Sequence, residues 1–164
     1  MELRSVEELM DLLYTGRGVW DTPAPGRGAH RHAAGMRGAG ARGVDVHDHA
    51  LQTAALLRRS RPADKELQVT GLVHPIGRLL GPADVAGRAG RAAEAVRALL
   101  GERVARLVRR HPWHGPAADD DDLVRLRQAD EDGRVAGFDA GVLEDWRTVL
   151  ELVAARNSRL GALD

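Results

Sequence analysis

Apolar residues recur along most of this chain at the three- and four-residue spacing of amphipathic helices, and no stretch alternates apolar and polar residues as a strand does. Ser5 and Glu8 form a capping-box pattern before the first apolar run, and Gly101 follows the end of another. Short connections between such helices favour an all-α bundle of six to seven helices around one core. The spacing predicts helices from Ser5 to about residue 13 and over residues 46–59, 63–74, 85–100, 102–110, 121–131 and 142–156.

Residues 15–43 interrupt this pattern with eight glycines and five arginines. So many glycines without apolar spacing predict a long loop, which could close over a pocket as a lid. His30 and His32 lie in this stretch, where an isolated His-x-His is a weak metal signal. The 164 residues are expected to form a single domain over residues 1–164.

Charge and composition exclude several classes of partner. The 24 basic and 24 acidic side chains balance, so no overall field favours nucleic acid or an anionic membrane. Cysteine is absent, which excludes disulfides and thiolate metal sites. The N-terminus is acidic and amphipathic, and the apolar runs are short, so neither secretion nor a membrane span is expected. These features predict a cytoplasmic protein.

Two polar residues fall on apolar faces. His111 lies four residues beyond Leu107, on the stripe of the predicted helix 102–110. Asp130 lies four residues beyond Leu126, on the stripe of helix 121–131. A buried carboxylate must be paired, hydrogen-bonded or bound to a metal. Both residues are therefore candidates for a shared interior site.

Two further histidines belong with them. His49 opens the predicted helix 46–59, and His74 stands directly before Pro75 in the apolar stretch "GLVHPIGRLL". Proline removes the N–H that would bond the carbonyl of Gly71, so the helix is expected to end or kink at His74. A single buried histidine is more often structural, but inward-facing His49, His74, His111 and Asp130 on four helices favour one site.

At these residues the chain resembles a known family. The segments "HDHALQTAALL", "LQVTGLVHPIGRLLG", "GRAGRAAEAVRALLGERVARLVRRH" and "LVRLRQADEDGRVAGFDAGVLEDW" resemble, in this order, the HD-domain oxygenases that cleave organophosphonates, which are relatives of myo-inositol oxygenase. The likeness covers about residues 44–156. It implies an HD-like helical bundle holding two irons, a mixed-valent pair that activates dioxygen. His49, His74, His111 and Asp130 match four of that family's iron ligands.

The resemblance fails at other positions. The bridging aspartate of the family falls on Pro75, and the histidine that closes its "HDIGH" motif falls on Arg78. Another iron-binding histidine is expected between these segments, but residues 75–110 contain none. A dinuclear centre without its bridge is not expected to assemble. The ordinary HD phosphohydrolase reaction is undermined by the same substitution.

Three hypotheses follow. The main one is a repurposed HD-fold enzyme without a cofactor, acting on a small organic metabolite in a specialised bacterial pathway. In it, His49, His74 and His111 are general acids or bases, and Arg78 clamps an anionic substrate or stabilises an oxyanion during cyclisation, isomerisation, dehydration or hydrolysis. In the second, His49, His74 and Asp130 hold one Fe(II) or similar ion of a mononuclear oxygenase. The third is a pseudoenzyme that binds a ligand or a partner protein.

Overall fold

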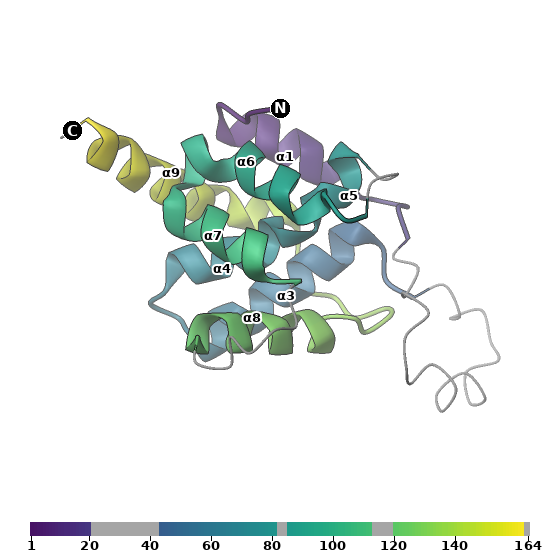
Figure 1. The fold of residues 1–164 in the computed structure, drawn as a ribbon. Helices are drawn as coiled ribbons and strands as arrows, with labels where there is room; N and C mark the ends of the chain where they lie inside the picture. Colours follow the sequence, from purple (N-terminus) through teal and green to yellow (C-terminus); the bar gives the residue numbers. More distant parts are fainter. Residues whose placement is uncertain (21–42, 82–84, 113–119, 163–164) are drawn as a thin grey trace.

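The computed structural model describes residues 1–20, 43–81, 85–112 and 120–162, and within these ranges the chain is all-helical (Figure 1). In these ranges the β-type pairing consists of one isolated bridge, between Trp20 and Asp45. The helices confirm the predicted all-α fold. The elements in order are α1 (Val6–Tyr14), α3 (Val46–Ser60), α4 (Lys65–Val73), the 3-10 helix η1 (His74–Ile76), α5 (Gly77–Leu80), α6 (Arg88–Leu100), α7 (Glu102–Arg110), α8 (Asp121–Asp132), the 3-10 helix η2 (Leu143–Trp146) and α9 (Arg147–Gly161).

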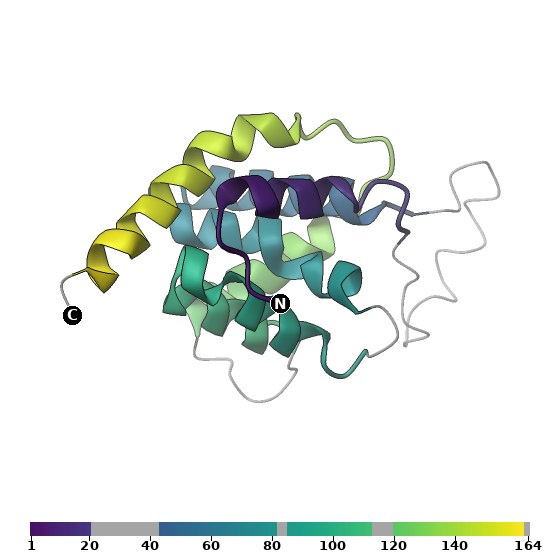
Figure 2. The same cartoon turned by 90° about the horizontal axis from the view of Figure 1, so that it is seen from above.

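The helices pack in consecutive pairs. α3 packs against α4, α6 packs against α7, and α8 lies against both α3 and α4. The last helix, α9, contacts α1, α4 and α6, and its C-terminal end projects beyond the bundle (Figures 1 and 2). No helix in the described ranges is both long enough and apolar enough to cross a bilayer.

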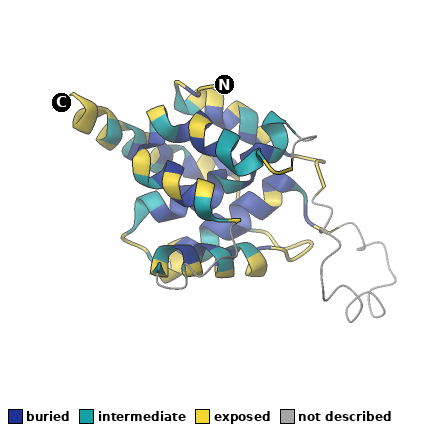
Figure 3. Ribbon diagram, in the orientation of Figure 1, coloured by how far each residue is buried: buried dark blue, intermediate teal, exposed yellow. Residues whose placement is uncertain are grey.

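The buried side chains form two clusters rather than the single core that the pattern predicts. The larger cluster draws residues from α1, α3, α4, α6, α7 and α9 and contains the fully buried Trp146. The buried stretches of the ribbon lie mostly inside the bundle, where the helices meet (Figure 3). The smaller cluster lies where α8 meets α3, α4 and α7. It consists of Leu57, Leu67, Leu107, Leu123, Leu126 and Ala129.

Most predicted helices are confirmed, with corrections at their first residues. Ser5 accepts the N–H of Glu8, as predicted, but the Glu8 carboxylate accepts the N–H of Arg4 rather than that of Ser5. The helix predicted from residue 85 begins at residue 88, and Val85 is 69% exposed. Val142 is also exposed, has an extended backbone and stands directly before η2. In both cases the predicted helix wrongly included an exposed apolar residue that stands before it.

An ion-pair cluster joins three helices on the surface near the smaller core. The two terminal nitrogens of the Arg103 guanidinium, Nη1 and Nη2, each donate to one carboxylate oxygen of Asp64 at 2.8 Å. Nη2 also donates to Oδ2 of Asp122 at 3.0 Å. Asp64 also caps α4 by accepting the N–H of Leu67. These contacts tie α4 to α7 and α8.

Acid should weaken this cluster. The hydrogen bond from Arg103 lowers the pKa of Asp64 in the folded protein below its usual 3.8. The ionised carboxylate therefore stabilises the fold at pH values above 3.8, and this stabilisation is lost as the pH falls through the pKa of the folded state. We expect Asp64→Asn to cost about 1 kcal/mol at pH 7 and to flatten the acid side of the stability profile. Urea unfolding between neutral and acid pH measures this, with the exposed Asp11→Asn as control. Parallel profiles for Asp64→Asn and the native protein would contradict it.

Candidate functional site

The His-Pro pair lies where α4 ends. α4 stops at Val73, and His74–Ile76 continue as a 3-10 turn with Pro75 near its start. Pro75 has no N–H for the carbonyl of Gly71, and the His74 ring fills this role, with Nδ1 2.6 Å from that oxygen. The predicted break at His74 is confirmed. Its consequence is that the proline frees a carbonyl that orients the imidazole.

His49 is oriented in a similar way. It lies in the first turn of α3, and its Nδ1 lies 2.8 Å from the carbonyl oxygen of Gly133, just beyond α8. Gly133 approaches α3 so closely that a Cβ there would lie 2.8 Å from Oγ1 of Thr53. Only glycine allows the backbone this near, so the carbonyl that holds the His49 ring depends on residue 133 having no side chain.

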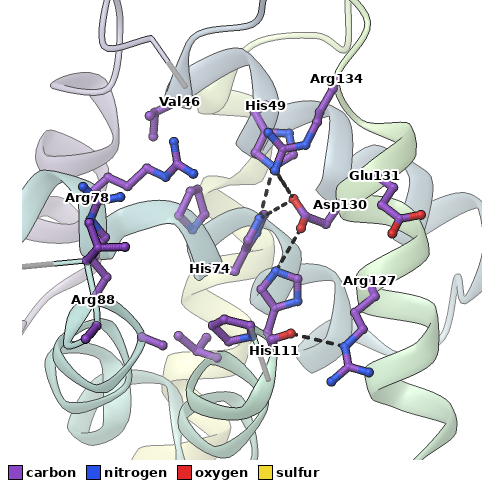
Figure 4. Close-up of a pocket in the computed structure, with 17 residues that line it drawn as sticks. Val46, His49, His74, Arg78, Arg88, His111, Arg127, Asp130, Glu131 and Arg134 are labelled. Atoms are coloured by element: carbon purple, nitrogen blue, oxygen red, sulfur yellow. Dashed lines mark hydrogen bonds and ion pairs between the residues drawn. The ribbon is translucent and has the colours of Figure 1, made fainter. Parts of the chain in front are cut away.

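Three side-chain atoms from three elements converge at the centre of the site (Figure 4). Oδ1 of Asp130 lies 2.6 Å from Nε2 of His49 and 3.3 Å from Nε2 of His74. The two Nε2 atoms are 3.2 Å apart. The side chains of both histidines are only 4% exposed, and that of Asp130 is 17% exposed. The site is therefore interior, as the sequence predicts.

Two further side chains hold the carboxylate. Nε2 of His111, at the end of α7, lies 3.0 Å from the other oxygen of Asp130, Oδ2. Arg134 approaches Oδ1 at 3.1 Å, one helical turn beyond Asp130. The three histidines predicted on inward faces, His49, His74 and His111, thus meet around the fourth predicted residue, Asp130.

Burial and hydrogen bonding determine the charges of His74 and Asp130. Desolvation lowers the pKa of His74 to about 4, more than contacts with Asp130 raise it. Burial by itself would raise the pKa of Asp130, but hydrogen bonds from His111, His49 and His74 outweigh it and hold that pKa far below its usual range. At neutral pH the centre therefore holds an ionised carboxylate beside a neutral His74.

The Nε2 atoms of His49 and His74 both point into the centre. In each ring the Nδ1 atom faces a backbone carbonyl, which accepts a hydrogen bond from an Nδ1–H and so leaves Nε2 as the nitrogen turned toward Asp130. Each Nε2 donates to Oδ1 of Asp130 when it carries a proton, and it can bind a cation once that proton is lost. Ligands about 2.1 Å from one ion stand roughly 3.0–3.4 Å apart. The two separations that involve His74, 3.2 and 3.3 Å, match this range, while the 2.6 Å between His49 and Asp130 is shorter. His49, His74 and Asp130 form a group that could hold one cation, with ligand atoms all within 4.8 Å of one another.

A cavity of about 610 Å³ adjoins this group, a size suited to a small organic molecule. Arg78 and Arg88 line it on one side, and Arg127 and Arg134 line it on the side of α8 (Figure 4). Valine, alanine and proline side chains, among them Val46 and Val108, line much of the rest, together with Gly77 and the carboxylate Glu131. Trp20 does not line the cavity and is 46% exposed.

His47 does not join this centre. It is buried, but its ring lies toward the carbonyl of Leu13 and stacks on Tyr14. The remaining histidines, His30, His32 and His114, lie outside the described residues, as does most of the predicted loop or lid, residues 21–42.

Sequence reasoning missed the orienting carbonyls of Gly71 and Gly133, because a backbone oxygen leaves no mark on residue type. It also missed Arg134, although the four-residue spacing from Asp130 is a usable signal. Comparisons of the chain with protein-family models and with curated proteins find no match.

Proposed function

We propose that this protein is an enzyme of HD-like fold that holds one divalent cation on His49, His74 and Asp130 and acts on a small anionic organic molecule. One observation carries the proposal: two imidazole nitrogens and a carboxylate oxygen from three elements face one another within 3.3 Å. Imidazole nitrogens and carboxylate oxygens are common ligands of divalent metal ions. An open two-His-one-carboxylate set is typical of mononuclear Fe(II) enzymes, so Fe(II) is the cation we expect.

The HD-like assignment draws support from where the matching residues lie. The resemblance selects His49, His74, His111 and Asp130 in four separate segments, and these four side chains meet in the fold. Pro75 stands where the resemblance expects the bridging aspartate, and it lines the cavity without offering a ligand atom. The residues present fit one cation and do not fit two.

The surrounding residues suggest how a substrate is handled. Arg78 and Arg88 would bind an anionic group on the wall opposite α8, while the apolar Val46 and Val108 exclude water beside the triad. A bound cation would supply Lewis acidity and, as Fe(II), the capacity to use dioxygen. The chain's own contribution is to orient the substrate and to turn the Nε2 atoms of His49 and His74 toward the cation.

The main sequence hypothesis, a metal-free acid-base enzyme, remains a prediction. It uses His49, His74, His111 and Arg78 as well, and it differs by expecting no uptake of metal. A pseudoenzyme was expected to have its pocket filled by Trp20, Trp113 or apolar groups. Trp20 leaves the cavity open, which favours an enzyme, and Trp113 lies outside the described residues.

Manganese titration tests the proposal. We expect the purified protein, freed of metal by a chelator, to bind one equivalent of Mn(II) and to give the electron paramagnetic resonance signal of an isolated ion. Two equivalents with an exchange-coupled signal would overturn the single-ion site. Uptake of no Mn(II), Fe(II) or Zn(II) would return the metal-free hypotheses to first place.

The Gly133 carbonyl provides a second prediction. We expect Gly133→Ala to weaken Mn(II) binding roughly 10- to 100-fold, because the new Cβ would clash with Thr53 and shift the carbonyl that orients His49. Titration against Mn(II) measures the change in Kd. Gly90→Ala in α6 is the matched control, since no atom of the described residues lies within 4 Å of its new Cβ. Equal affinities of the two variants would contradict the orienting role.

A further inference from the structure

His111 differs from the other two histidines of the centre in how its ring is held. His49 and His74 each turn Nδ1 to a backbone carbonyl, at 2.8 and 2.6 Å. Nδ1 of His111 is buried and has no hydrogen-bond partner among the described residues. Metal-binding histidines usually donate their second ring N–H to an acceptor that fixes the ring. His111 lacks this arrangement in the described part of the chain, so its surroundings are not those of a ligand.

The proton of His111 therefore belongs on the opposite nitrogen. Nε2 lies 3.0 Å from Oδ2 of Asp130, which is an acceptor, while no acceptor in the described ranges faces Nδ1. Neutral His111 is thus the Nε2–H tautomer and donates to Oδ2. It presents an N–H to Oδ2, whereas the carbonyls that face Nδ1 of His49 and His74 leave their Nε2 atoms available to a cation.

The backbone keeps His111 in place against α8. Its N–H donates to the carbonyl of Leu107 at the end of α7. Its own carbonyl accepts from Nε of Arg127, on the helix that carries Asp130. The ring and the carbonyl of one residue thus join the end of α7 to two positions of α8 (Figure 4).

These contacts divide the two oxygens of Asp130 between different partners. His111 takes Oδ2, while Oδ1 faces His49 and His74 and also accepts from Arg134. A carboxylate with one oxygen engaged in this way cannot rotate freely or use both oxygens on one ion.

We infer that His111 is a positioning residue, whose Nε2–H holds Oδ2 of Asp130 so that Oδ1 alone completes the cation site with His49 and His74. This rests on the single-cation site proposed above. It assigns His111 neither a place among the ligands nor a proton-transfer step.

Three substitutions at one position test this role. A glutamine side chain would place an amide N–H near the present Nε2, whereas asparagine is one methylene shorter and alanine has no donor. We expect His111→Gln to keep the affinity for Co(II) within about threefold of the native value. His111→Ala and His111→Asn should each weaken it roughly 10- to 100-fold. The visible absorption of bound Co(II) should change with these two variants, because a freed carboxylate can offer both oxygens.

The possible outcomes separate this inference from the proposed function. If the native protein binds one Co(II) and all three variants match it in affinity and spectrum, His111 has no positioning role, and the single-cation site stands. If the native protein binds two Co(II) and His111→Gln binds one, His111 is a ligand and the inference fails. Failure of the native protein to bind metal overturns both. If His111→Ala does not fold, the comparison of His111→Gln with His111→Asn still decides.

Discussion

Asp130→Asn should abolish high-affinity metal binding. The substitution removes the negative charge and the oxygen that lies 2.6 Å from His49 and 3.3 Å from His74. Loss of an orienting residue around a metal costs roughly 10- to 100-fold in affinity, so loss of a ligand should raise the Kd by more than about 100-fold. Calorimetric titration with Mn(II) measures this directly.

Thermal unfolding gives an independent measure. A cation at about 100 times its Kd should stabilise the native protein by about 2.7 kcal/mol and leave Asp130→Asn unchanged. The control is Asp132→Asn, which removes an exposed carboxylate from the same helix and should keep the full metal response. A variant Asp130→Asn that binds Mn(II) as tightly as the native protein would show that the ion lies elsewhere.

The second large effect concerns the larger core. Trp146 is 1% exposed where η2 meets α9, and the guanidinium of Arg58 lies 4.9 Å from its ring centre. Trp146→Ala should lower the free energy of unfolding by about 3–5 kcal/mol, since it removes apolar contacts and leaves a cavity. For a domain of this size the melting temperature should fall by roughly 6–20 °C.

Urea unfolding followed by circular dichroism tests this prediction. Leu160→Ala is the control, because Leu160 lies on α9, the helix that follows Trp146, and is 67% exposed. Its stability should stay within about 0.5 kcal/mol of the native value. A loss below about 1 kcal/mol for Trp146→Ala would mean that Trp146 contributes little to the core.

Periodicity predicted the helices well because burial in a bundle follows the helical repeat. The errors at Val85 and Val142 share a cause, because the sequence alone does not distinguish a buried apolar residue from an exposed one next to a helix. Pro75 was the most informative single residue for local structure. Its missing N–H predicted the break at His74 without any tertiary information.

The site was predicted less completely. Inward-facing positions singled out His49, His74, His111 and Asp130, and the resemblance grouped them as ligands. Neither the pattern nor the resemblance could separate His111 from the others, because its distinct role depends on a ring atom without a partner in the described chain. The glycine at 133 could not be interpreted for a similar reason: its close approach to Thr53 exists only in the folded chain.

The separation of these residues along the chain has a kinetic consequence. Asp130 lies 81 residues from His49 and 56 from His74, so the three meet only after α8 has docked on both α3 and α4. A bound ion then acts mainly on the completed structure and raises the barrier to leaving it. Removing that ion with a chelator should accelerate unfolding and change the refolding rate little, so the occupied site would set the lifetime of the folded chain.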